Sequence, residues 1–176
     1  MNNVLHTQNC IIQPVNDPEA SSRDIHWDVL RIDQVHPVVS GNKWFKLAPY
    51  LEYARQTGAR GLLSFGGAWS NHLHALAYAA REAGLSSIGL VRGEAPATLS
   101  ETLADARDMG MELLFLPRNI YAALSRETDA GSIKHALQDI LAAGPQAPVN
   151  EKIAWGDYLV IPEGGYGIPG MQGAAG

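Results

Sequence analysis

Two short polar segments carry the side chains best suited to chemistry in this sequence. Lys43 follows the pair Gly41-Asn42 and precedes an apolar pattern with helical spacing. Further along, Gly66 and Gly67 lead into Ser70-Asn71-His72. A lysine amine on a turn can react with a cofactor aldehyde, and a glycine turn that opens a helix can hold an anion. Together the two segments predict Schiff-base chemistry on a small amino acid.

The lysine segment has two interpretations. A lysine is a useful nucleophile only when its amine is neutral for part of the time. Burial and a neighbouring cation both lower a lysine pKa, and Lys46 lies at helical spacing from Lys43. The competing interpretation is that Lys43 closes a loop and points into water, as most lysines do. Gly41 and Asn42 do not decide the matter, because glycine and asparagine also form ordinary turns.

The serine segment also leaves two interpretations open. It lies where an expected strand runs into an expected helix, and the first amide groups of a helix have no internal partner. The helix dipole is positive there, so a carboxylate or phosphate fits. A plain N-cap by Ser70 or Asn71, worth about 1 kcal/mol, explains the same residues. His72 and His74 point to different sides of a helix, so a shared zinc ion is not predicted.

Short apolar runs alternate with helical patterns along the chain. Strands are expected at 27–33, 61–65, 87–91, 112–116 and 158–161, and helices at 45–57, 70–82, 99–109, 118–126 and 133–141. This alternation predicts an α/β fold with a parallel sheet covered by helices on both faces. The stretch 144–150 contains glycine and two prolines, which favour a loop or a crossing between lobes.

Composition narrows the class of protein. Hydrophobic residues make up 46% of the 176 residues and charged residues 18%, as in ordinary globular proteins. The net charge is −5 and the thirteen basic residues form no stripe, so nucleic acid and membranes are poor partners. Cys10 is the single cysteine, which favours a reducing compartment. No secretory signal or bilayer-length apolar run is found, and we expect a cytoplasmic protein.

Three features of the sequence carry a family resemblance. They are Gly41-Asn42-Lys43 with Lys46-Leu47, Gly66-Gly67 with Ser70-Asn71-His72, and the alanine-rich helix before Gly84-Leu85. In this order and separation they resemble the 1-aminocyclopropane-1-carboxylate deaminase and D-cysteine desulfhydrase family. The match is strong over residues 40–91, with a fainter echo at 162–165. The resemblance implies the tryptophan synthase β-like fold, that is, fold type II of the pyridoxal 5′-phosphate enzymes, incomplete at the C-terminus.

The same resemblance implies a role for each site residue. Lys43 would carry the cofactor through a Schiff base and move protons, and Asn71 would hydrogen-bond the cofactor's ring hydroxyl. Ser70 and His72 would face the substrate carboxylate or the reacting carbon, with Ser70 as base or anchor. The protein would then be a deaminase or desulfhydrase that releases ammonia and a 2-oxo acid from 1-aminocyclopropane-1-carboxylate or a D-cysteine-like substrate. Full-length members of such families are usually homodimers.

The resemblance also implies a division into lobes. Residues 1–47 and 155–176 would belong to a larger cofactor-binding lobe, with 48–154 forming a smaller inserted lobe. The glycine-rich end reads as that of a fragment, which would place the phosphate loop and the pyridine-nitrogen ligand beyond this chain. Trp69 occupies the position where active family members tend to have Gln, so the family's substrate is not assigned to this chain. Two alternatives stay open: an inactive fragment serving as a folded or oligomerising lobe, and a nucleotide-binding module.

Overall fold

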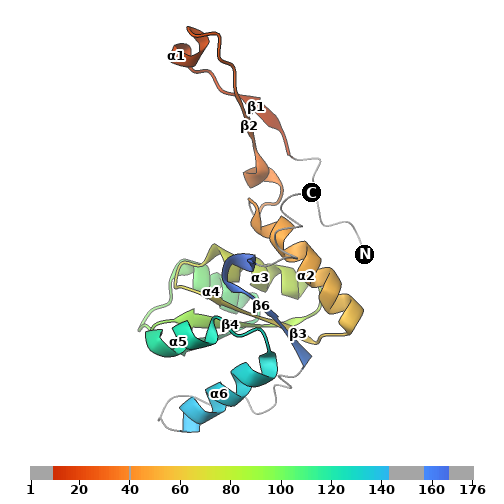
Figure 1. Cartoon of the computed structure of the whole chain (residues 1–176), viewed down its shortest axis with the longest axis vertical. Helices are drawn as coiled ribbons and strands as arrows, with labels where there is room; N and C mark the ends of the chain where they lie inside the picture. Colours follow the sequence, from red (N-terminus) through yellow and green to blue (C-terminus); the bar gives the residue numbers. More distant parts are fainter. Residues whose placement is uncertain (1–9, 40, 143–156, 167–176) are drawn as a thin grey trace.

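A four-stranded parallel sheet forms the centre of the protein (Figure 1). The computed structural model describes residues 10–39, 41–142 and 157–166. The strands are β3 (Gly61–Gly66), β4 (Ser86–Arg92), β5 (Met111–Leu116) and β6 (Tyr158–Ile161). Their order across the sheet is β5-β4-β3-β6. From β3 the chain adds β4 and β5 on one side, and it later returns to add β6 on the other side of β3. The winding direction of the sheet therefore reverses at β3.

Helices cover both faces of this sheet, as the sequence predicts (Figure 1). One face carries α2 (Lys43–Thr57), α3 (Asn71–Glu82) and α4 (Glu101–Asp108), and the other carries α5 (Arg118–Leu124) and α6 (Ala130–Ala142). Successive side chains of a strand point to opposite faces. Accordingly Leu62 packs under α2 and α3, whereas Leu63 and Phe65 pack under α5 and α6. Burial of such side chains in two apolar layers is the main force that holds the sheet between its helices.

The α/β fold expected from the sequence is confirmed. Each expected helix and strand from residue 45 onward has a counterpart whose ends lie within a few residues. The strand expected at 27–33 is shorter, and three small elements near the N-terminus were not expected. The loop expected at 144–150 lies outside the described residues. Strand β6 pairs with β3 in the sheet of the 48–154 segment, and the division into two lobes stays a prediction.

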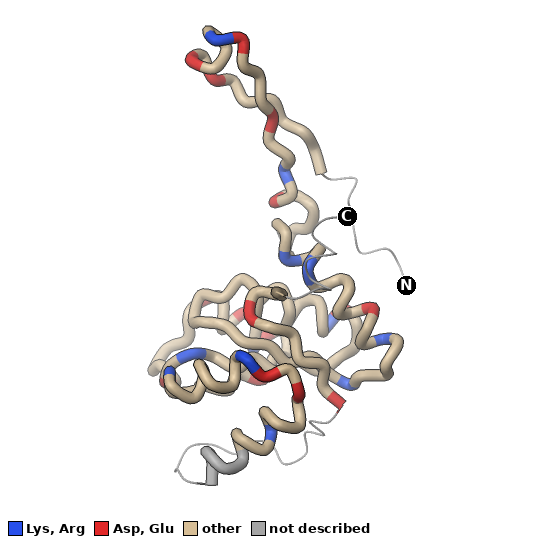
Figure 2. Tube along the Cα trace, in the orientation of Figure 1, with Lys and Arg blue, Asp and Glu red and all other residues tan. Residues whose placement is uncertain are grey.

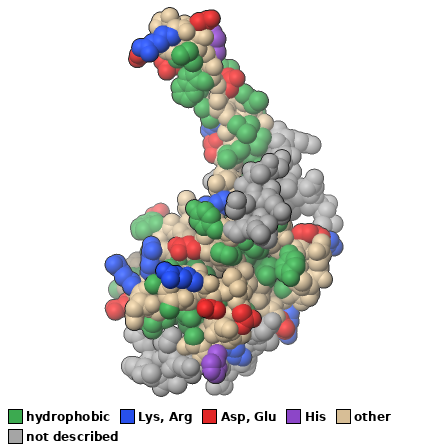
Figure 3. All heavy atoms as spheres, in the orientation of Figure 1, with side chains coloured by type: hydrophobic (Ala, Val, Ile, Leu, Met, Phe, Trp, Pro, Cys, Tyr) green, Lys and Arg blue, Asp and Glu red, His purple; other side chains and the backbone are tan. Residues whose placement is uncertain are grey.

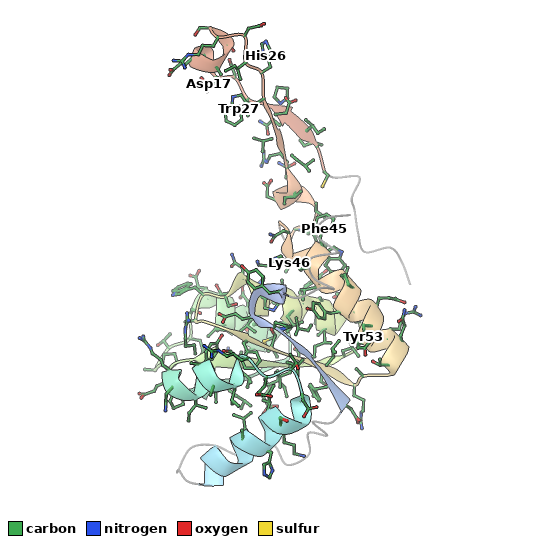
Figure 4. All side chains as sticks on the ribbon, viewed as in Figure 1. Asp17, His26, Trp27, Phe45, Lys46 and Tyr53 are labelled. Atoms are coloured by element: carbon green, nitrogen blue, oxygen red, sulfur yellow. The ribbon has the colours of Figure 1, made fainter. Side chains whose placement is uncertain are left out.

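An extended N-terminal arm projects from the body of the molecule (Figure 1). It consists of the antiparallel strands β1 (Ile12–Pro14) and β2 (Asp28–Leu30) with α1 (Pro18–Ser21) at the tip, and η2 (Ile32–Gln34) follows β2. Large apolar side chains on it are exposed, namely Ile11, Ile12, Ile25, Trp27, Val29 and Leu30. Figure 3 shows this apolar surface along the arm, and Figure 4 shows Trp27 on its side. The described residues leave this surface uncovered.

Lys and Arg residues alternate with Asp and Glu residues along the trace, without a long run of one sign (Figure 2). Most of the ion pairs lie at the surface, such as the 2.7 Å contact between Arg31 and Asp33. Exposed pairs of this kind contribute little to stability. Within the described part of the chain, no helix is both long enough and apolar enough to span a bilayer.

Candidate active site

The carboxyl end of β3 is the place where this fold favours a ligand. In open parallel sheets, ligands bind beyond the carboxyl ends of the strands where the winding direction reverses. The loop after β3 runs from Gly66 to Ser70, and the loop after β6 contains η4 (Glu163–Gly165). Because β3 and β6 are parallel neighbours, these two loops leave the sheet at the same edge. The sequence-predicted serine segment therefore lies at the reversal point of the sheet.

Lys43 is the first residue of α2, directly after the turn formed by Gly41 and Asn42. Gly41 has φ +67, a left-handed conformation that favours glycine. The Lys43 side chain is partly buried, and burial is the first cause that lowers its pKa from the usual lysine value. The charge of Lys46 is the second cause. The structure thus favours a lowered lysine pKa over the interpretation in which Lys43 points freely into water.

The loop before α3 is tightly packed around Gly66. A Cβ on Gly66 would lie 2.5 Å from the Ser70 Oγ, so only glycine fits there. Ser70 is the N-cap of α3, and its Oγ accepts a hydrogen bond from the Leu73 amide at 3.2 Å. The capping interpretation of this segment is therefore confirmed. Anion binding at the same helix end stays a prediction, because a capping hydroxyl can still donate its own proton.

Asn71 and Lys43 come together in one hollow of about 540 Å³. The hollow lies between the first turns of α2, α3 and α4, and His74, Glu101 and Asp105 also line it. The His74 Nε2 is 3.6 Å from the Asp105 Oδ2. Side chains of both charge signs thus face the space beside Lys43. Such a polar recess suits a small zwitterionic ligand, whose two charges need opposite partners.

His72 occupies a different position, buried behind the first turn of α3, with only 3% of its surface exposed. Its Nε2 lies 2.8 Å from the Ser64 Oγ, and the Ser64 hydroxyl donates to the Ile161 carbonyl at 2.7 Å. A hydroxyl has one proton, so the network assigns the ring proton to Nε2. Burial, followed by the charges of Lys43 and Lys46, lowers the His72 pKa to about 4. The ring is therefore neutral near neutral pH.

A second contact lies where α2 meets the loop after β6. Gly165 has φ +70, and a Cβ there would lie 3.2 Å from the Lys46 Cβ and 3.6 Å from the His72 Cε1. The Lys46 Nζ lies 4.5 Å from the centre of the Tyr166 ring, a cation–π contact. Figure 4 shows Lys46 near the end of α2 that faces this loop. The Tyr166 backbone carbonyl also accepts a hydrogen bond from the Tyr50 hydroxyl at 2.9 Å.

The predicted site residues therefore fall into two groups. Lys43 and Asn71 share the hollow, whereas Ser70 caps the helix and His72 lies buried beside Ser64. Sequence reasoning did not find Ser64 or the Ile161 carbonyl as partners of His72. Ser64 is the one hydroxyl in the buried strand β3, and this isolated polar residue in an apolar run was the available signal. Ser40, at the edge of the lysine segment, lies outside the described residues.

Comparison with known proteins gives one relative by sequence. No protein-family profile matches the chain. It is 39% identical over 70 residues to a protein of Oryza sativa subsp. japonica named "Putative D-cysteine desulfhydrase 2, mitochondrial". The aligned segment covers 40% of this chain and 17% of the rice protein. The match agrees with the family resemblance found in the sequence motifs.

Solved structures share the fold over most of the chain. One, described as an ACC deaminase homologue, is 24% identical with a TM-score of 0.61 and aligns with 94% of this chain. A fungal L-serine ammonia-lyase from Rhizomucor miehei is 15% identical with a TM-score of 0.55 and also aligns with 94%. The chain spans 45% and 43% of their respective lengths. These likenesses confirm the tryptophan synthase β-like fold. The rice protein bears out the resemblance to the deaminase and desulfhydrase family.

Proposed function

We propose that this chain supplies the reactive-lysine part of a pyridoxal 5′-phosphate-dependent enzyme that acts on a small amino acid. The reaction is of the deaminase or desulfhydrase type, releasing ammonia and a 2-oxo acid from 1-aminocyclopropane-1-carboxylate or a D-cysteine-like substrate. The observation that carries the proposal is the hollow shared by Lys43 and Asn71, together with the lowered pKa of Lys43. The names of the rice relative and of the aligned structures support the same class of chemistry.

The residues present fit this cofactor. An aldehyde requires an amine that is neutral for part of the time, and burial lowers the pKa of Lys43 in that direction. A ring hydroxyl would take a hydrogen bond from a polar side chain, and Asn71 lines the same hollow as Lys43. The bound cofactor would act as the electron sink for bonds at the substrate's α-carbon. Lys43 would hold it covalently, and Asn71 would hydrogen-bond its ring hydroxyl.

The remaining site residues would orient the substrate. The first turn of α3 presents amide groups and the positive end of a helix dipole, which suits the substrate carboxylate. The Ser70 hydroxyl accepts from the Leu73 amide and keeps one proton to donate to that carboxylate. Lys46 contributes a fixed positive charge beside Lys43, since its ammonium rests on the Tyr166 ring. Lys43, when not covalently engaged, would move protons at the reacting carbon.

The test is covalent attachment of the cofactor at a single lysine. The chain is incubated with pyridoxal 5′-phosphate, reduced with borohydride and mapped by peptide mass spectrometry. Lys43 is expected to carry the label, which Lys43→Met should abolish and the matched variant Lys46→Met should leave in place. Equal labelling of the wild type and Lys43→Met would overturn the assignment of the reactive lysine.

A second candidate function is a folded lobe that only associates with other protein segments. The exposed apolar arm favours it, because patches of that kind commonly mark contacts between proteins. Titration of the chain with cofactor separates the two candidates, since saturable binding excludes an inactive lobe. The homodimer and the cytoplasmic location stay predictions.

A further inference from the structure

A buried histidine lies between η2 and α2, directly ahead of the turn that carries Lys43. It is His36, with 7% of its surface exposed. Its Nδ1 accepts two hydrogen bonds, from the Val38 amide at 3.1 Å and from the Val39 amide at 3.0 Å. Asparagine and aspartate side chains make local bonds of this kind in Asx turns, and here an imidazole takes their role. Val39 is completely buried, so water cannot replace the ring as the partner of its amide.

The two bonds also fix the protonation of the ring. A ring nitrogen that accepts a hydrogen bond carries no proton, so His36 is neutral with its proton on Nε2. A proton on Nδ1 would meet two further donors and would release the segment. Pro37 follows the histidine, and its fixed φ limits the backbone freedom between the ring and the two amides. The ring and the segment 38–39 therefore form one restrained unit.

The same ring contacts residues on the other side of the turn. Its centre lies 6.0 Å from that of the Trp44 ring, with an angle of 13° between the two planes, which is a stacked arrangement. Trp44 is buried and directly follows Lys43. The Tyr78 ring of α3 lies 4.9 Å away at 55°. His36 thus joins the segment before the turn, the residue after Lys43 and the helix that carries Asn71.

The turn needs such contacts because α2 begins without a side-chain cap. The Asn42 side chain makes no capping hydrogen bond, whereas serines cap α3 and α4. The helix dipole also disfavours a cation at the first helical position, which Lys43 occupies. The Gly41 amide donates to the Ile32 carbonyl at 3.1 Å, which holds one point of the turn. His36 adds contacts on both of its flanks.

We infer that His36 is a positioning residue that holds the turn 41–43, and with it the Lys43 amine, at the hollow. Val38, whose amide the ring binds, lines the same hollow as Lys43, so release of this segment would change the hollow itself. The inference rests on the proposed function, because only a reactive lysine needs its amine held in one place.

The first test is borohydride-trapped cofactor labelling of Lys43, with its rate measured relative to Lys134 on α6. His36→Phe keeps a ring but removes the acceptor, and the relative rate should fall about tenfold, the effect of losing about one hydrogen bond. His36→Asn keeps an acceptor at the same number of bonds from the backbone, and the rate should stay within about twofold of the wild type. The control His26→Phe changes a histidine whose side chain is 78% exposed, and it should leave the rate unchanged.

A further control separates positioning from a general loss of stability. Ile133→Ala removes a completely buried side chain on the opposite face of the sheet, so it lowers stability without touching the turn. Its relative rate should equal that of the wild type. A fall in Ile133→Ala like that in His36→Phe would overturn the inference, and so would equal rates in His36→Phe and His36→Asn or a lower rate in His36→Asn. His36→Leu, which also lacks an acceptor, replaces His36→Phe if that variant does not fold.

Amide hydrogen exchange in the cofactor-free chain separates this inference from the proposed function. The Gly41 amide, which is bonded to the Ile32 carbonyl, reports on the turn itself. Its exchange relative to the Leu63 amide should accelerate about tenfold in His36→Phe and stay unchanged in His36→Asn. Unchanged exchange at Gly41 in His36→Phe would overturn the inference and leave the proposed function intact. Absence of Lys43 labelling in the wild type would refute the proposed function, and exchange at Gly41 would then decide the positioning role alone.

Discussion

The buried imidazole of His72 should make the stability of this protein depend on pH in a defined window. The folded state lowers the His72 pKa from 6.5 to about 4, mainly through burial. In the unfolded chain His72 therefore becomes protonated below about pH 6.5, whereas in the folded chain it becomes protonated only near pH 4. The stability that the neutral His72 contributes is fully present above about pH 6.5. It is lost as the pH falls from about 6.5 to about 4.

The size of the effect follows from the shift. One pKa unit corresponds to about 1.4 kcal/mol, so the full window is worth about 3 kcal/mol and the part down to pH 5 about 2 kcal/mol. These values are a large share of the stability of a domain of this size, which is about 5–15 kcal/mol. Salt should change them little, because desolvation rather than exposed charge is the first cause.

The assay is urea unfolding at about pH 7.5 and about pH 5, in the wild type and in His72→Gln. Other groups titrate in the same range, so the informative quantity is the difference between the two proteins at each pH. His72→Gln should lose about 2 kcal/mol less than the wild type on acidification. His135→Gln, an exposed histidine on α6, is the control and should follow the wild type. If His72→Gln and the wild type lose equal stability on acidification, the prediction that a buried, neutral His72 causes the pH dependence is wrong.

Three further predictions concern the strand and loop before α3. Gly66→Ala should lower the unfolding free energy by about 2 kcal/mol, because the added Cβ would lie 2.5 Å from the Ser70 Oγ. Gly67→Ala is the control: its added Cβ would lie 3.6 Å from the nearest atom, so the unfolding free energy should change by less than about 0.5 kcal/mol. Equal losses would refute the packing argument. Phe65→Ala should cost about 3–5 kcal/mol as a fully buried side chain, and Trp69→Ala, 71% exposed, should stay within about 0.5 kcal/mol by the same denaturation. Ser70→Ala should lower the melting temperature through loss of about 1 kcal/mol of capping, and an unaltered melting temperature would contradict the cap.

Much of the fold was predictable because its signals are local. Apolar runs such as 61–65, bounded by glycine, indicate buried strands, and Gly58 and Gly84 end the helices before them with left-handed backbone. The short β1 and α1 were missed because only a few residues form each of them. Periodicity needs several turns or several alternations to be recognised.

The candidate site was predictable only in part. Residue types pointed to Lys43 and to the serine segment, and the structure brings Lys43 and Asn71 to one hollow. The choice between a cap and an anion site at Ser70 required the observed hydrogen bond to the Leu73 amide. The burial of His72 could not be read from the sequence, because the polar first turn of a helix can face either solvent or a neighbouring strand.

The amino-acid sequence alone determined the alternation of strands and helices, the lysine on a turn and the glycine loop before a capped helix. These features depend on backbone preferences and on spacing within a few residues. The partnership of Ser64, His72 and Ile161 was decided only by the tertiary structure, since it joins residues 97 positions apart across parallel strands. The lowered pKa values of Lys43 and His72 arise in the same way, because burial exists only after the sheet and its helices have packed.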